Sequence, residues 1–237
     1  MNLAIKKTLD KFQKDLKERF DRKIIDIVIY GSVIRGGFNS KKSDIDFIVF
    51  LNEELTEVDI VKIKELHAEY RMTRNLLSLL EGRYIAIDNN RFVNGYYVGT
   101  NVKGWKQLTE TGFNDIEVAM ILDSYLSLFM TNTISKLLHF DWIEIRNQIC
   151  MQIEGFLNNE LLLSDEGFKK YALITAARSL YTYLESGFIS KNRAQQWIEH
   201  NFLKIDYQKP RECLIRIREI IRKNSLNSDK WRYITNN

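Results

Sequence analysis

The 237-residue sequence predicts an α/β (α+β) domain with a small mixed sheet, followed by an all-α helical domain. Short β-branched or apolar runs, typical of buried strands, occur only before about residue 113. Beyond that point apolar residues recur at helical spacing, and the single proline, Pro210, suits long unbroken helices. We expect the first domain to span residues 1–141 and the second 142–237.

The first domain is expected to run helix, strand, strand, helix, strand. The expected elements are an amphipathic helix on Leu9, Phe12, Leu16 and Phe20, strands at Ile24–Tyr30 and Ile45–Leu51, a helix at Thr56–Leu80 and a strand at Gly82–Ile87. This order implies a small mixed sheet that helices cover.

The second half carries helical stripes and no strand signal of any length. The stripes are Val118, Ile121, Leu122, Tyr125, Leu128 and Phe129; Ile145, Ile149, Ile153, Phe156 and Leu157; Tyr171–Leu184; Arg193–His200; and Leu214, Ile217, Ile220 and Ile221. Ser190 is a suitable N-cap for the helix that contains Arg193–His200.

Composition narrows the class of function. The net charge of +4 is too weak to indicate a nucleic-acid partner, although a basic cleft for a polyphosphate stays open. No apolar run approaches membrane-spanning length, and the first residues lack the apolar stretch of a signal peptide. We therefore expect a cytoplasmic protein without a membrane partner. Cys150 and Cys213 are expected to be buried free thiols.

A glycine–serine pair follows the first strand. Gly31 permits close approach of the backbone to a ligand, and the chain is expected to turn into a helix after Ser32. The Ser32 hydroxyl and the free N–H groups of that helix start can then hold phosphate oxygens.

Two aspartates stand where the second strand begins. Asp44 and Asp46 are two residues apart, so in a strand their side chains point to one face. Paired carboxylates repel each other unless a cation neutralises them. Mg²⁺ suits such oxygen ligands and also bridges substrate phosphates. A solvated Asp-x-Asp is common, but here the pair leads directly into an apolar strand.

The Gly-Ser and Asp-x-Asp segment resembles the signature of the nucleotidyltransferase superfamily. The wider chain resembles the aminoglycoside nucleotidyltransferases that adenylylate streptomycin and spectinomycin. Further points of resemblance are Leu80-Glu81 before a short strand, Trp105, and Arg178 with Ser186-Gly187-Phe188-Ile189, Lys191 and Trp197.

This resemblance implies roles for single residues. Asp44 and Asp46 would hold Mg²⁺, and Glu81 would be the general base that takes the proton of the acceptor hydroxyl. Gly31, Ser32, Arg178 and Lys191 would bind the nucleotide, with ATP as the default, and Trp105 would bind the acceptor. Asp88, at the far end of the third strand, is the rival base.

The chain also departs from the family, and this leaves the acceptor open. Phe168 stands where the streptomycin and spectinomycin enzymes carry an acidic residue, although Asp165 and Glu166 are near. The family's Gly-Pro between the domains is absent from Leu137–Trp142. An aminoglycoside or aminocyclitol antibiotic is the expected acceptor. The alternatives are a lincosamide, another metabolite, a protein hydroxyl, or a nucleotide-binding protein without catalysis.

Overall fold

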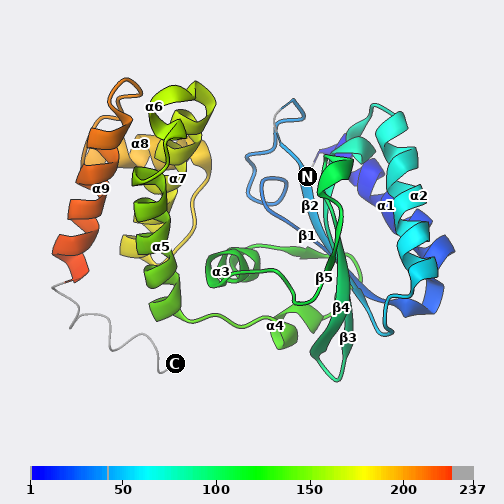
Figure 1. Cartoon of the computed structure of the whole chain (residues 1–237). Helices are drawn as coiled ribbons and strands as arrows, with labels where there is room; N and C mark the ends of the chain where they lie inside the picture. The colour runs from blue at the N-terminus through cyan, green and yellow to red at the C-terminus, as the bar shows by residue number, and fades with distance from the viewer. Residues whose placement is uncertain (1, 42, 226–237) are drawn as a thin grey trace. The chain divides into compact units, whose positions relative to one another are not determined.

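The computed structural model describes residues 2–41 and 43–225, and these divide into two compact units between His139 and Phe140. The first unit contains α1 (Leu3–Phe20), β1 (Ile24–Tyr30), β2 (Ile45–Leu51), α2 (Glu57–Met72), β3 (Leu80–Asp88), β4 (Arg91–Val98), β5 (Lys106–Leu108), α3 (Asp115–Asp123), β6 (Leu126–Ser127) and α4 (Thr133–Leu137) (Figure 1). The domain limits 1–141 and 142–237 stay a prediction.

The six strands form one mixed sheet in the order β5-β4-β3-β2-β1-β6. Strands β2 and β3 are parallel, and the other neighbouring pairs are antiparallel. The predicted small mixed sheet is therefore confirmed. Parallel neighbours need a crossover, and α2 provides it.

Helices α1 and α2 lie side by side over one face of this sheet (Figure 1). Between them and the sheet is the apolar core, in which Phe12 of α1, Phe47 of β2 and Tyr84 of β3 are fully buried. Alternate residues of β2, such as Ile45, Phe47 and Val49, face this core. The residues between them, Asp46 included, point to the opposite face.

A histidine lies at the centre of this core. His67 of α2 is fully buried, stacks on Phe47 with ring centroids 5.7 Å apart, and its Nε2 is 2.9 Å from the Tyr84 hydroxyl. Burial, with a smaller effect of the Arg71 charge, lowers the pKa of His67 to about 3. His67 is therefore neutral at physiological pH.

We expect His67 to make the protein sensitive to acid. Its pKa is about 6.5 when unfolded and about 3 when folded, so the unfolded chain binds more protons between those values. The contribution is fully present above pH 6.5 and is lost as pH falls toward 3. From about pH 7.5 to about pH 4.5 this costs up to about 3 kcal/mol.

Urea unfolding at both pH values checks this expectation. His67→Gln should lose less stability on acidification than wild type, whereas His139→Gln, at an exposed position, should match wild type. Equal pH dependence of wild type and His67→Gln would contradict the assignment.

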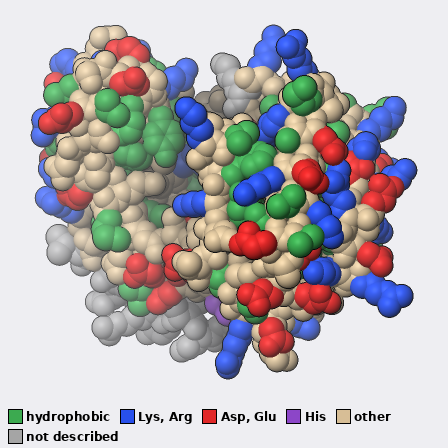
Figure 2. All heavy atoms as spheres, turned by 45° about the vertical axis from the view of Figure 1, so that its right-hand side comes forward, with side chains coloured by type: hydrophobic (Ala, Val, Ile, Leu, Met, Phe, Trp, Pro, Cys, Tyr) green, Lys and Arg blue, Asp and Glu red, His purple; other side chains and the backbone are tan. Residues whose placement is uncertain are grey.

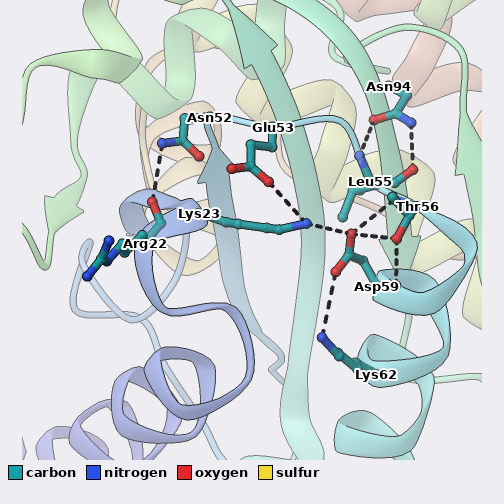
Figure 3. Close-up of polar contacts among 9 residues, drawn as sticks. All are labelled: Arg22, Lys23, Asn52, Glu53, Leu55, Thr56, Asp59, Lys62 and Asn94. Carbon is teal, nitrogen blue, oxygen red and sulfur yellow. Dashed lines mark hydrogen bonds and ion pairs between the residues drawn. The ribbon is translucent and has the colours of Figure 1, made fainter.

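A polar network joins the ends of several elements at the edge of the sheet where β2 ends (Figure 3). Asp59 is the N3 residue of a capping box on α2 and accepts bonds from Thr56 N at 3.1 Å and Lys23 Nζ at 3.0 Å. Burial opposes its ionisation, but the bonds from Thr56 and Lys23 outweigh it and lower the pKa of Asp59. Asn94 of β4 exchanges two further hydrogen bonds with the backbone of Leu55.

The predicted helix at Thr56–Leu80 is too long. Helix α2 ends at Met72, Arg74 has φ +52°, and a 3₁₀ turn at Leu76–Leu79 leads into β3. A non-glycine residue with positive φ interrupts a helix, so the change at Arg74 separates the two segments.

The single helical stripe expected from Val118 to Phe129 is also wrong. Helix α3 stops at Asp123, and β6 pairs with β1. The cause is Asp26, a fully buried carboxylate on β1 that accepts hydrogen bonds from Ser127 Oγ, Thr131 Oγ1 and Phe129 N. These bonds fix residues 126–131 along the edge of the sheet.

The described elements of the second unit are all helical, as the sequence predicts. They are α5 (Trp142–Leu157), α6 (Leu161–Ser164), α7 (Glu166–Glu185), α8 (Lys191–Asn201) and α9 (Pro210–Ser225). Polar bonds connect them: Ser179 Oγ of α7 donates to Gln152 Oε1 of α5 at 2.6 Å, and Glu154 of α5 accepts from Arg218 of α9 at 3.3 Å.

Three surface properties complete the description. Acidic and basic side chains are interspersed among the described residues on the face drawn in Figure 2. No helix of the described residues is both long and apolar enough to span a membrane. Cys213 is buried as expected, but Cys150 is exposed, because it lies on the solvent side of α5.

Candidate active site

Strand pairing brings two of the predicted carboxylates, Asp46 and Glu81, together. Tyr30 pairs with Asp46 across β1 and β2, and Asp46 pairs with Glu81 across β2 and β3. Residues paired in register share a face of the sheet, which here is the face opposite α1 and α2. Tyr30, Asp46 and Glu81 line a pocket of about 370 Å³ together with Arg83 and Glu117.

Gly31 is required where it stands. Its φ is +72°, and a Cβ atom there would lie 2.1 Å from Oδ2 of Asp46. The glycine therefore allows the chain to turn after β1 while the Asp46 carboxylate packs against its Cα. A glycine here is expected from the sequence, but the neighbour that requires it, the Asp46 carboxylate, is visible only in the structure.

We expect Gly31→Ala to impair catalysis more than Gly36→Ala does. Gly36 also has positive φ, at +71°, but nothing lies within 4 Å of a Cβ there. Both substitutions should cost about 1 to 2 kcal/mol of backbone strain. Only Gly31→Ala should also displace the Asp46 carboxylate and reduce transfer by about a hundredfold. Equal activity of the two folded variants would contradict this role.

The segment after Gly31 is a series of turns, so the predicted helix there is wrong. Bonds from Arg35 N to Gly31 O at 3.1 Å and from Gly37 N to Ser32 O at 3.0 Å close the turns, but the following residues do not continue a helix. The Ser32 hydroxyl is buried and has no hydrogen-bond partner among the described residues. A buried hydroxyl without a partner can donate a hydrogen bond to a ligand oxygen.

Arg35 holds this segment against α3. Its Nη2 donates to the Met120 carbonyl at 2.6 Å and to Asp123 Oδ2 at 2.8 Å. The Arg35 guanidinium therefore has a structural function in fixing the turns beside Ser32.

Glu81 is held in a defined orientation. The Tyr97 hydroxyl donates to Glu81 Oε1 at 2.5 Å, and Thr100 N donates to Oε2 at 3.0 Å. Burial and the bond to Glu81 raise the pKa of Tyr97, which keeps the phenol protonated as a donor. Each Glu81 oxygen still has a lone pair for another hydrogen atom.

Asp88, the rival base, lies elsewhere. It is the last residue of β3 and pairs with Arg91 in a hairpin. It is seven positions beyond Glu81 along the strand, or about 23 Å away. Glu81, unlike Asp88, is therefore adjacent to Asp46.

Asp44 comes just before β2, and its negative charge acts on Arg71, as the charge of Glu81 does. Burial lowers the pKa of Arg71, while the charges of Glu81 and Asp44 raise it. No group of three or more His, Cys, Asp or Glu side chains in residues 2–41 and 43–225 is arranged as a metal site. Mg²⁺ commonly takes only one or two carboxylates and completes its shell with phosphate and water. The pair Asp44 and Asp46 fits that requirement.

Comparison with known families agrees with this arrangement. Residues 9–87, which include both aspartates and Glu81, match the model for the family described as "Nucleotidyltransferase domain". The predicted class of enzyme, a nucleotidyltransferase, is thereby confirmed.

A solved structure extends the likeness to the whole fold. The spectinomycin adenyltransferase AAD(9) from Enterococcus faecialis, crystallised with ATP and spectinomycin, matches with a TM-score of 0.61 at 16% identity. The match covers 92% of this chain and 99% of that one. The resemblance to aminoglycoside nucleotidyltransferases is confirmed at the level of fold and domain. The comparison with curated proteins found no match.

Trp105 follows the nucleotidyltransferase domain and has structural contacts. Its Nε1 donates to Gly99 O at 2.8 Å, and its ring lies 6.1 Å from that of His67, against the core under α1 and α2. These contacts are on the face of the sheet opposite Asp46. The role of Trp105 in binding an acceptor stays a prediction.

Arg178 and Lys191 lie in one part of the helical unit. Arg178 Nε on α7 donates to the Ile189 carbonyl at 3.2 Å, in the segment that leads into α8. Lys191 is the first residue of α8 and is exposed. Arg178 therefore fixes the segment that presents Lys191, and the nucleotide-binding role of the two stays a prediction.

The acids near Phe168 have local functions. Asp165 caps α7 by accepting from Phe168 N, and Glu166 pairs with Lys169. Phe168 itself packs against Phe156, with ring centroids 6.1 Å apart. At the start of α7, Phe168 therefore packs against an apolar neighbour, and the two acids are engaged in local contacts.

The sequence did not single out three residues that line the pocket. Tyr97 of β4 and Arg83 of β3 line the pocket, and Arg83 donates to Gly112 O at 3.0 Å and lies 3.9 Å over the Phe113 ring. Glu117 of α3 lies 4.0 Å from Arg83. A signal existed for Arg83, because it is two residues beyond Glu81 on one strand and so shares its face.

Proposed function

We propose that this protein transfers a nucleoside monophosphate, AMP from ATP, to a hydroxyl of a small acceptor. The observation that carries the proposal is the placement of Asp46 and Glu81 on adjacent strands, beside Gly31, within a nucleotidyltransferase domain. A cytoplasmic location, where ATP is abundant, and the absence of nucleic-acid and membrane partners belong to the same proposal.

The residues after β1 bind the triphosphate in this proposal. Gly31 lets a phosphate approach the backbone, and the buried Ser32 hydroxyl donates to a phosphate oxygen. Asp44 and Asp46 would hold Mg²⁺, which when bound would neutralise charge on the phosphate oxygens.

Glu81 acts as the general base. It accepts the proton of the acceptor hydroxyl as the oxygen forms a bond to the α-phosphorus and the bond to pyrophosphate breaks. Tyr97 and Thr100 hold the carboxylate in place, so little reorganisation is needed during the reaction. Phosphoryl transfer of this kind depends on positioning and charge neutralisation.

An aminoglycoside or aminocyclitol antibiotic is the proposed acceptor, with spectinomycin as the first compound to test. The support is the fold shared with AAD(9), whose structure contains ATP and spectinomycin. The carboxylates Glu81 and Glu117 give the pocket groups that can bind a cationic acceptor. Trp105 is proposed to contribute to acceptor binding.

The same chemistry with another acceptor is the second candidate. The observation that favours it is the presence of Arg83 and Lys106 in the pocket, because their positive charges suit an acceptor of lower positive charge. A lincosamide, a metabolite and a protein hydroxyl are all compatible with it.

We expect Lys191→Ala to weaken ATP binding about ten- to a hundredfold. Each charge-assisted bond to a phosphate is worth about 1.5 to 3 kcal/mol, and an exposed lysine contributes little to folding. Calorimetry of ATP binding tests this against Lys170→Ala, an exposed lysine on α7. Unchanged affinity in Lys191→Ala would show that Lys191 does not bind the nucleotide.

Drug susceptibility tests the proposed acceptor class. Cells that express the wild-type gene should tolerate more spectinomycin or streptomycin than cells that express Asp46→Asn at the same protein level. Equal susceptibility to every aminoglycoside and aminocyclitol would contradict the antibiotic acceptor and favour the second candidate.

A further inference from the structure

The guanidinium group of Arg71 donates a hydrogen bond to the backbone next to Glu81. Arg71, in the last turn of α2, is half-buried, and its Nη2 donates to the Leu80 carbonyl at 2.9 Å and to the Gly99 carbonyl at 2.7 Å. One nitrogen therefore joins the first residue of β3 to the segment that follows β4.

These two carbonyls adjoin the groups that define the Glu81 geometry. Leu80 precedes Glu81, and Gly99 precedes Thr100, whose N–H donates to Glu81 Oε2 at 3.0 Å. The two bonds of Arg71, added to the pairing of Gly82 with Val98 in the ladder, thus help to fix the distance between the Glu81 backbone and the Thr100 amide. The Trp105 indole donates to the same Gly99 carbonyl and is a further support for it.

Packing between α2 and the sheet does not by itself explain why a charged residue, Arg71, is present at this position. Its Nε and Nη1 are buried without a hydrogen-bond partner among the described residues, which is costly for a cation. The charges of Glu81 and Asp44 act favourably on the guanidinium, while burial alone lowers its pKa. A hydrophobic residue would pack there at lower cost, so the charge and the two bonds need another explanation.

We propose that Arg71 is a positioning residue for Glu81. By joining the Leu80 and Gly99 carbonyls it keeps the Thr100 amide on Glu81 Oε2, and its charge offsets repulsion between Glu81 and Asp44. Loss of the guanidinium shifts the Glu81 carboxylate away from the acceptor hydroxyl and leaves nucleotide binding unchanged. The proposal rests on the role of Glu81 as base.

Amide hydrogen exchange at Thr100 tests the geometric part without any substrate. In Arg71→Met the Thr100 amide should exchange at least about tenfold faster, which corresponds to about 1.4 kcal/mol, while the Val49 amide in β2 keeps its rate. Arg71→Lys should fall between wild type and Arg71→Met. Arg22→Met, which removes an arginine 98% exposed, should match wild type. Unchanged Thr100 exchange in folded Arg71→Met would overturn the proposal.

Kinetics with ATP and spectinomycin test the catalytic part. Arg71→Met should lower kcat about ten- to a hundredfold with an unchanged KM for ATP, and Arg71→Lys should recover part of the loss. Wild-type kcat in folded Arg71→Met would overturn the proposal. If wild type itself transfers nothing to spectinomycin, spectinomycin is not the acceptor, and the Thr100 exchange decides on Arg71. If Arg71→Met does not fold, Arg71→Gln, which keeps a donor, replaces it in both measurements.

Discussion

Asp46→Asn should lose nucleotide transfer by about a thousandfold and keep its fold. The substitution preserves the size of the side chain that packs over Gly31 and removes its charge. A metal-binding carboxylate stabilises the transition state by several kcal/mol, and about 4 kcal/mol corresponds to this factor. The measurement is the rate of pyrophosphate release at saturating ATP and acceptor, with thermal unfolding to show that the fold is intact.

Two comparisons make the Asp46 result specific. Asp10→Asn, which removes an exposed carboxylate on α1, should leave the rate unchanged. Excess Mg²⁺ should restore part of the Asp46→Asn rate, because the defect is one of metal affinity. A wild-type rate for Asp46→Asn at ordinary Mg²⁺ would show that Asp46 is not a metal ligand in the reaction.

Glu81→Gln should bind ATP as wild type does and transfer its nucleotide about 10² to 10⁴ times more slowly. The amide can still accept from Thr100 N, so the local structure is retained, but it cannot take a proton from the acceptor. Calorimetry measures the ATP affinity, and single-turnover kinetics measure the transfer step separately from product release.

Asp88→Asn is the matched control for Glu81→Gln. Asp88 is on the same strand but at its far end, and it is exposed. It should therefore keep the wild-type rate. Full activity of Glu81→Gln together with loss of activity in Asp88→Asn would mean that the base has been assigned to the wrong carboxylate.

The local part of the site could be predicted from the sequence because each signal lies within one segment. Asp44 and Asp46 precede an apolar run, and Gly31-Ser32 follow another. The contacts between segments could not be predicted, because they depend on strand register. The pairing of Asp46 with Glu81 and the bond from Tyr97 to Glu81 both arise from register.

The missed strands have physical explanations. The sequence of β4 contains Asn94 and Gly95, which are unfavourable in strands, so the strand could not be predicted. In the structure Asn94 hydrogen-bonds to the backbone of Leu55. Strand β6 has only two residues and exists because buried Asp26 binds the segment around Ser127. Such effects of tertiary structure outweigh the helical spacing that the segment shows by itself.

The central claim is tested most directly by the mass of the products. Purified protein, ATP and Mg²⁺ are incubated with a panel of acceptors that includes spectinomycin, streptomycin and a lincosamide, beside Asp46→Asn under the same conditions. The structure predicts that one acceptor gains the mass of a nucleoside monophosphate, with one pyrophosphate released per product, and that Asp46→Asn yields neither. Clear ATP binding with no product and no pyrophosphate from any acceptor would contradict it.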